Sequence, residues 1–139
     1  MIILDTNILS EIMRSEPSVK VMEWLRDQPV LSFYITTITQ AEIFYCIALL
    51  PSSERRTKLH KTAIAMFRED FNGRILSFDL EAAEMFAEIA SNRQQAGQPI
   101  SQFDAQIAAI ARSRGAGVAT RNDRDFLNCG IDVINPWSS

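Results

Sequence analysis

The feature that most constrains the fold is an alternation of short apolar segments with longer segments of helical spacing. Five short segments have the aliphatic and β-branched composition of strands, namely 2–4, 32–36, 74–78, 117–120 and 131–134. Helical periodicity and helix-breaking residues mark the segments between them as helices, at 7–13, 19–28, 39–50, 53–71, 80–96 and 101–114. Strands that alternate with helices predict an α/β fold, with a mostly parallel central sheet of about five short strands flanked by helices.

The length of the chain predicts a single domain over residues 1–139, which is long enough to bury about two thirds of its unfolded surface. No signal peptide is expected, because Asp5 interrupts the apolar start and no basic residues precede it. The longest apolar run, 43–50, is much shorter than the roughly 20 residues of a membrane-spanning helix. Cys46 and Cys129 lack the spacing of metal ligands and are expected to be reduced thiols. These features predict a cytoplasmic protein without a membrane partner.

The charge balance argues weakly against a general nucleic-acid binder. The chain has 14 basic and 17 acidic residues, a net charge of −3. If three of the acidic residues surround a cation, however, the remaining charges balance. A nucleic-acid substrate is therefore disfavoured by the net charge but is not excluded by it.

Polar residues follow the first and fourth of the predicted strands. Asp5 comes directly after segment 2–4, and Asn122 and Asp123 come shortly after segment 117–120. Each has an ordinary structural interpretation, since Asp5 or Thr6 can cap the helix that follows, and Asn122 with Asp123 can form a turn. Taken singly, these positions favour the structural interpretation.

Two further acids open predicted helices. Thr39 and Glu42 have the spacing of a capping box, in which the glutamate returns a hydrogen bond to the capping residue. Ser101 and Asp104 have the same spacing, and an acid in a first turn also suits the helix dipole. Capping therefore explains each of these acids when it is taken alone.

Taken together, the acids indicate a site. In parallel α/β sheets, ligands bind beyond the carboxyl ends of the strands, where these side chains are expected to converge. Each pair of like charges about 4 Å apart costs roughly 4 kcal/mol at an effective dielectric near 20. A domain stabilised by about 5–15 kcal/mol would need protons or cations to relieve several such repulsions. Oxygen-only ligands favour Mg²⁺ or Mn²⁺, which activate water and neutralise phosphodiesters. The pattern thus predicts a phosphate-ester hydrolase.

Five blocks of the sequence contain these polar residues or lie near the end of the chain, namely IILDTNILSE, ITTITQAEI, ISQFDAQIAAIA, ATRNDRDF and INPW. Together they resemble the PIN-domain ribonucleases, and in particular the VapC-type toxins of bacterial toxin–antitoxin modules. The resemblance implies that Asp5, Glu42 and Asp104 hold a divalent ion and orient the attacking water. The fourth acidic position of the family matches Asn122, a neutral ligand, with Asp123 one residue further. This departure from the family pattern favours one well-held ion over two.

The resemblance also implies the cofactor, the substrate and the partners. The cofactor is Mg²⁺, with Mn²⁺ as a substitute, and the reaction is hydrolysis of RNA phosphodiesters. The implied partners are a cognate antitoxin and a second copy of the chain, with promoter DNA bound only indirectly through the antitoxin. Supporting roles next to the ligands fall to Thr6, Asn7, Ser10, Thr120 and Asp123. RNA contacts are expected from Arg14, Arg121 and Arg124, for which surface solubility is the competing explanation.

Two other functions are kept as alternatives. In a non-catalytic interaction module, the acids would be helix caps and would bind no Mn²⁺. An aspartyl-phosphate phosphatase would use Asp5 as its nucleophile, but such enzymes place a second aspartate two residues later, where this chain has Asn7. Large apolar residues beyond the needs of a small core, such as Phe44 and Tyr45, are expected to form either core or a partner-binding groove.

Overall fold

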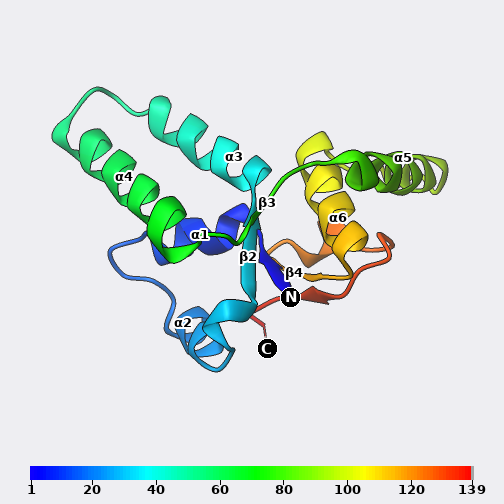
Figure 1. Ribbon diagram of the computed structural model, residues 1–139, viewed down its shortest axis with the longest axis horizontal. Helices are drawn as coiled ribbons and strands as arrows, with labels where there is room; N and C mark the ends of the chain where they lie inside the picture. The colour runs from blue at the N-terminus through cyan, green and yellow to red at the C-terminus, as the bar shows by residue number, and fades with distance from the viewer. Residues whose placement is uncertain (139) are drawn as a thin grey trace.

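The computed structural model describes residues 1–138 and has a five-stranded parallel sheet at its centre (Figure 1). The strands are β1 (Ile2–Leu4), β2 (Phe33–Thr36), β3 (Ile75–Leu76), β4 (Gly117–Ala119) and β5 (Val133–Ile134), in the order β3-β2-β1-β4-β5. All four pairings between neighbouring strands are parallel. The α/β fold with a parallel central sheet is therefore confirmed.

Helices connect and cover the strands. They are α1 (Thr6–Ile12), α2 (Val19–Arg26), α3 (Thr37–Ala48), α4 (Glu54–Ala65), α5 (Leu80–Gln95) and α6 (Gln102–Arg114). Short 3₁₀ turns occur at η1 (Val30–Ser32) and η3 (Asp123–Phe126), and α4 continues into a π-helical turn, η2 (Met66–Asp70). Within residues 1–138, no helix has the length and apolar character needed to cross a membrane.

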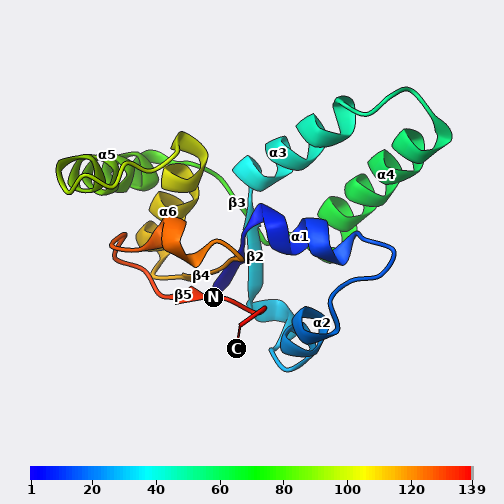
Figure 2. The ribbon, with the colours of Figure 1, turned by 180° about the vertical axis from the view of Figure 1, so that it is seen from behind.

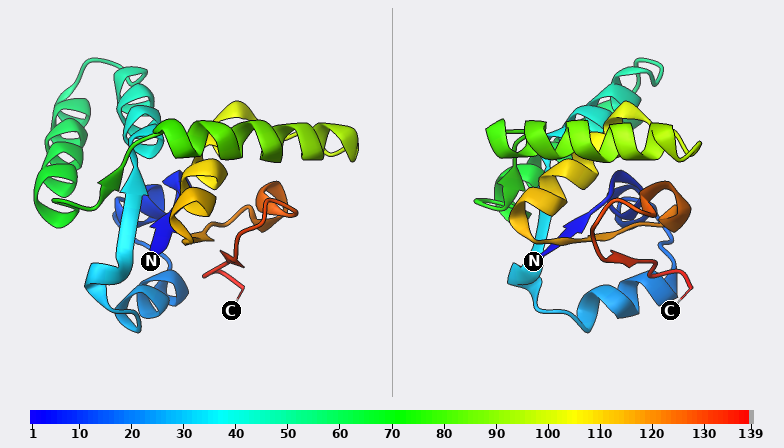
Figure 3. Two further views of the ribbon diagram at one scale, coloured as in Figure 1. Left: turned by 45° about the vertical axis from the view of Figure 1, so that its right-hand side comes forward. Right: turned by 90° about the vertical axis from the view of Figure 1, so that its right-hand side faces the viewer.

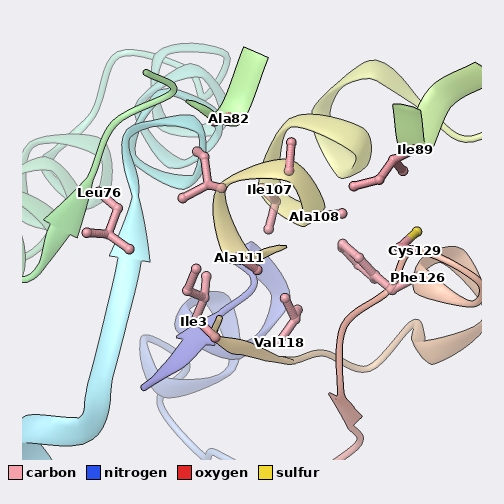
Figure 4. Close-up of a cluster of buried hydrophobic side chains, with 13 residues drawn as sticks. Ile3, Leu76, Ala82, Ile89, Ile107, Ala108, Ala111, Val118, Phe126 and Cys129 are labelled. Carbon is pink, nitrogen blue, oxygen red and sulfur yellow. The ribbon is translucent and has the colours of Figure 1, made fainter. Parts of the chain in front are cut away.

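Alternation along the strands divides the core into two layers. Successive side chains of a strand point to opposite faces of the sheet. Ile3 and Val118 therefore pack on the face covered by α5 and α6, where Figure 4 shows them with Phe126 and Cys129. Leu4 and Ala119 pack on the other face, against apolar residues of α1, α3 and α4. Figure 2 shows α1 between α3 and α2 on this side, and Figure 3 shows α5 running past the end of α6.

The structure corrects the predicted start of the third helix. Thr36, not Thr39, is the cap of α3, and its hydroxyl accepts a 3.1 Å hydrogen bond from the Thr39 amide. The capping box predicted for Thr39 and Glu42 is therefore wrong, because the helix begins three residues earlier than expected. Strands β3 and β5 are also shorter than predicted, and Ser32 belongs to a 3₁₀ turn. Glu42 thus lies within α3 and needs another explanation.

The strand order places a crevice beside the end of β1. From β1 the chain moves outward to β2 and β3 on one side of the sheet, and later to β4 and β5 on the other. Where the strand order reverses in this way, the loops at the carboxyl ends diverge and leave room for a ligand. Asp5, the residue after β1, occupies this position.

Candidate active site

Asp5 is both the cap of α1 and a fixed, inward-facing carboxylate. Its amide donates to the Ala119 carbonyl at 2.9 Å, which extends the pairing of β1 with β4 by one residue. Its Oδ1 accepts from the Thr6 amide at 2.8 Å, as a capping side chain does. Its Oδ2 accepts from the Thr120 hydroxyl at 2.8 Å and from Asn7 Nδ2 at 3.3 Å. Asp5 is only 5% exposed, so these four contacts determine its orientation.

Glu42 is held by α1 rather than by the start of its own helix. The Thr6 hydroxyl donates a 2.8 Å hydrogen bond to Glu42 Oε1 and lies 3.1 Å from the Thr39 hydroxyl. Thr39 is buried, so this pair of hydroxyl groups joins α1 to α3 below the protein surface. Thr6 consequently binds one acid through its amide and another through its side chain, which ties Asp5 and Glu42 to the same residue.

Asp104 enters the site from the first turn of α6. Ser101 caps this helix, as predicted, and its hydroxyl accepts from the Asp104 amide at 3.2 Å. The cap fixes the first turn of α6 and thereby the direction in which Asp104 leaves the backbone. Asp104 is half-buried and lines the same pocket as Asp5 and Glu42.

The three carboxyl groups share one electrostatic environment. The pKa of Asp5 is raised to about 6, mainly by burial. The hydrogen bonds from Thr120 and Thr6 oppose this rise, and the negative charges of Asp104 and Glu42 add to it. Burial is also the main cause of the raised pKa values of Glu42 and Asp104. The negative charge of Asp104 raises the pKa of Glu42 further. A bound cation would favour the charged form of all three.

These acids lie in an open pocket of about 510 Å³. The pocket is lined by Asp5, Thr6, Asn7, Ser10, Glu11, Arg14, Glu42, Asp104, Arg121, Asn122 and Trp137. Thr120 lies behind it, buried against Asp5. The lining does not include Asp123, which is exposed and accepts a hydrogen bond from the Arg124 amide, or Arg124 itself. Of the two candidates for the fourth position, the structure thus places Asn122 in the pocket.

Hydrogen bonds join the loop after β4 to the loop after β1. The Thr120 hydroxyl accepts from the Asn122 amide at 3.1 Å and from Asn7 Nδ2 at 3.2 Å. Asn7 Oδ1 accepts from the Arg121 amide at 3.1 Å. Asn7 and Thr120 therefore position both Asp5 and the segment that carries Asn122.

Sequence reasoning missed Glu11 and Trp137, which also line the pocket. Glu11 is buried, pairs with Arg14 at 3.2 Å and accepts from the Ser18 amide at 2.9 Å. The Ser18 hydrogen bond is the main cause of the lowered pKa of Glu11. A signal for Glu11 was available, because polar residues at positions 7, 10, 11 and 14 have the spacing of one helix face.

Sequence reasoning also missed Arg93, a buried cation whose charge acts on Asp104. It is 6% exposed and reaches from α5 to the carbonyls of Gln98 at 2.6 Å, Asp125 at 3.0 Å and Leu127 at 2.8 Å. Its charge lowers the pKa of Asp104, whereas the charge of Asp125 raises it. Arg93 therefore anchors the η3 segment that follows Asn122. No feature of the surrounding polar stretch 91–95 distinguishes this arginine in the sequence.

The donor set fits a hydrated, hard divalent cation. Asp5, Glu42, Asp104 and Asn122 offer only oxygen or amide ligands to the pocket. In the part of the chain that the structure describes, no three His, Cys, Asp or Glu side chains are close enough to form a ready-made metal cage. Mg²⁺ typically takes one or two carboxylates and keeps several water molecules, so an open pocket of this kind suits it.

Comparison with known proteins identifies relatives over the whole chain. The chain is 40% identical over 139 residues to "Plasmid stability protein StbB" of Pseudomonas syringae, covering 100% of both proteins. It is 36% identical over 137 residues to "VapC ribonuclease Y4jK" of Sinorhizobium fredii, covering 99% of this chain and 98% of that protein. It is also 36% identical over 137 residues to "Toxin FitB" of Neisseria gonorrhoeae, covering 99% of both.

A solved structure and a family model agree with these relatives. "Structure of FitAB bound to IR36 DNA fragment" contains a chain that superposes with a TM-score of 0.94 at 36% identity, covering 100% of this chain and 97% of that one. The model of the PIN domain matches residues 2–131. The chain, with its parallel sheet and its acidic pocket at the end of β1, therefore belongs to the PIN-domain family.

Proposed function

We propose that this protein is a Mg²⁺-dependent endoribonuclease that acts as the toxin of a toxin–antitoxin pair, with Mn²⁺ able to replace Mg²⁺. The observation that carries the proposal is the meeting of Asp5, Glu42 and Asp104 in one pocket, with raised pKa values. The choice of RNA as substrate rests on the PIN-domain membership and on relatives named as ribonucleases.

In this proposal Asp5 and Asp104 hold the metal ion, and Glu42 binds it directly or through water. Asn122 supplies a neutral oxygen that orients a ligand or a water molecule. When bound, the ion would neutralise the charge of the phosphodiester and lower the pKa of a water molecule. One neutral and three acidic ligands favour one well-held ion.

The residues around the acids position them for this chemistry. Thr120 and Asn7 hold Oδ2 of Asp5, and Thr6 holds Glu42 toward the pocket so that it can position the attacking water. Two arginines at the rim, Arg14 and Arg121, supply positive charge for the phosphates on either side of the scissile bond. Arg124 lies outside the pocket lining, which leaves it only a more distant contact with the RNA.

A groove next to the pocket suits the antitoxin. It has a volume of about 790 Å³, is lined by residues of α1, α3 and α4, and shares Thr6, Ser10 and Arg14 with the acidic pocket. Tyr45, near the end of α3, and Leu49, the residue that follows this helix, lie outside the groove lining and are 65% and 66% exposed. An antitoxin segment in this groove would lie beside the acids and block them.

The remaining partners and the location follow from the same proposal. A homodimer would bury exposed apolar residues of this kind. Promoter DNA would be bound only through the antitoxin, in line with the net charge of −3 and with the DNA complex of the related FitAB pair. The protein would act in the cytoplasm, where its RNA substrates are.

The two alternatives fit the geometry less well. The interaction module explains Asp5 as a cap, but it leaves Glu42 without a capping function. The phosphatase needs a second acid at position 7, whereas the side chain of Asn7 bonds to Asp5, Thr120 and the Arg121 amide.

The test is an RNA cleavage assay. The antitoxin-free protein is incubated with total tRNA and with a structured mRNA, in Mg²⁺, in Mn²⁺ and in chelator, and Asp104→Asn serves as the control. Discrete fragments that need the metal and are absent with the variant would support the proposal. Failure to cut any RNA, together with failure to bind Mn²⁺, would leave the interaction module as the better account.

A further inference from the structure

The rim of the acidic pocket carries a stacked pair of side chains, Arg121 and Trp137. The guanidinium carbon of Arg121 lies 5.2 Å from the centre of a Trp137 ring, and both residues line the pocket that contains Asp5 and Asp104. Trp137 is partly buried against the apolar layer that contains Leu4, whereas Arg121 is exposed. The stack therefore has one side on the protein core and the other toward the pocket.

Hydrogen bonds fix the backbone on both sides of this stack. The Arg121 amide donates to Asn7 Oδ1 at 3.1 Å, and the Arg121 carbonyl accepts from Asn135 Nδ2 at 3.1 Å. Asn135 Oδ1 in turn accepts from the Trp137 amide at 3.0 Å, beside the buried Pro136. These hydrogen bonds already order the backbone of Arg121 and Trp137. Ligand binding to the pair would therefore cost little conformational entropy of the backbone.

We propose that Arg121 and Trp137 form a stacking platform for one unpaired nucleobase of an RNA substrate. Proteins bind splayed bases by stacking them on aromatic rings and on guanidinium planes, and both are present here. A base in a duplex is stacked between its neighbours and cannot reach such a platform. Because the platform borders the carboxylates, the nucleotide it holds lies next to the bond that is cut. The inference rests on the proposed nuclease function and adds to it a binding subsite for one unpaired base at the rim of the pocket.

The first test uses Trp137 as its own reporter. The chain has two tryptophans, and Trp24 is partly buried against Phe33, so Trp24→Phe leaves Trp137 as the only one. This variant is combined with Asp104→Asn to prevent cleavage and is titrated with a mixed-sequence 12-nucleotide RNA. Single-stranded RNA is expected to quench the fluorescence at a concentration at least tenfold lower than the same RNA annealed to its complement. Equal quenching by the duplex would overturn the proposal.

The second test separates stacking from a structural role of Trp137. In the Asp104→Asn background, Trp137→Leu should weaken binding of the labelled single strand about 5- to 150-fold, whereas Trp137→Phe should retain most of it. With Asp104 intact, Trp137→Leu should raise KM and leave kcat within about twofold. Melting temperatures of both variants, by circular dichroism, show whether each is folded at the assay temperature.

The outcomes distinguish this inference from the proposed function. If Trp137→Leu binds and cuts RNA as the unmodified protein does, the platform is refuted and the nuclease stands. If Trp137→Phe and Trp137→Leu weaken binding equally without loss of folding, aromatic stacking is refuted. If the unmodified protein neither binds nor cuts RNA in the presence of Mg²⁺ or Mn²⁺, both proposals fail together.

Discussion

Thr120 and Asp5 are 115 residues apart in the sequence, yet the Thr120 hydroxyl donates a 2.8 Å hydrogen bond to Oδ2 of Asp5. The contact exists because β4 pairs with β1 in parallel, which brings the ends of the two strands together. The same hydroxyl accepts from Asn7 and from the Asn122 amide. One buried threonine thus connects the first acid of the pocket with the segment that carries the fourth position.

Removing this hydroxyl should weaken metal binding without abolishing the fold. Residues that orient metal ligands typically contribute 10- to 100-fold to metal affinity, so Thr120→Val should lower Mn²⁺ affinity by about tenfold or more. It also leaves the Asn122 amide without its acceptor, at a cost of about 1–3 kcal/mol in the free energy of unfolding. Calorimetric titration and urea denaturation measure the two effects. Thr120→Ser, which keeps the hydroxyl, is the control, and unchanged Mn²⁺ affinity in Thr120→Val would contradict the assigned role.

The pKa of Asp5 predicts how stability depends on pH. Folding raises this pKa from 3.8 to about 6, so between these values the folded chain binds more protons than the unfolded chain. The free energy of unfolding of the metal-free protein should therefore fall as pH rises from about 4 to about 6, by at most about 1.4 kcal/mol per pH unit from this group. Mn²⁺ affinity should rise over the same range, because the metal needs the deprotonated carboxylate.

Asp5→Asn tests this assignment, since asparagine is also a good helix cap and keeps an oxygen for the Thr6 amide. The variant should be more stable than the unmodified protein at pH 7 without metal, and its stability should vary less between pH 4 and 6. Thermal melts across this range measure both. A lower melting temperature at pH 7 would instead favour the interaction module, in which Asp5 is mainly structural.

The substitutions Asn122→Asp and Asp123→Asn should affect Mn²⁺ binding differently. Asn122 lines the pocket, so Asn122→Asp adds a carboxylate to the proposed ligands Asp5, Glu42 and Asp104 and should raise the number of Mn²⁺ ions bound from one to two. Asp123→Asn, the matched change at the exposed neighbouring position, should leave Mn²⁺ binding unchanged. Electron paramagnetic resonance of free Mn²⁺ gives the stoichiometry. A loss of Mn²⁺ binding in Asp123→Asn would show that the fourth position was assigned to the wrong residue.

Arg93 should contribute more to stability than an arginine on the surface. Arg93→Met leaves the carbonyls of Gln98, Asp125 and Leu127 without this donor and should lower the free energy of unfolding by about 1–3 kcal/mol. Arg112→Met is the matched control, because its ion pair with Glu88 at 3.0 Å is partly exposed and should contribute less than about 1 kcal/mol. Urea denaturation of both variants measures the difference. Equal losses would contradict the anchoring role of Arg93.

The sequence was most informative about the parts of the fold that local pattern determines. The apolar strands, the cap at Ser101 and the position of Asp5 after β1 all follow from short-range rules. The cap of α3 was predicted wrongly because Thr36 and Thr39 are equally good capping residues. Only the length of β2 decides between them.

Long-range packing determined what local pattern did not predict. Trp137 reaches the pocket because β5 pairs with β4 in parallel, which brings the turn after β5 next to the loop after β4. Arg93 reaches η3 from α5. No short-range pattern in the sequence predicts either contact. Likewise, the geometry of the loop after β4 decides that Asn122, and not Asp123, lines the pocket. The sequence alone does not distinguish the two positions.

The central claim is that the pocket of Asp5, Glu42 and Asp104 binds a divalent metal ion through Asp104. Calorimetric titration of the antitoxin-free protein with Mn²⁺ at pH 7.5 tests it most directly, beside Asp104→Asn and Asp123→Asn. We expect one ion per chain in the unmodified protein and in Asp123→Asn, and at least tenfold weaker binding in Asp104→Asn. Equally tight binding in Asp104→Asn, or no binding in the unmodified protein, would contradict the account.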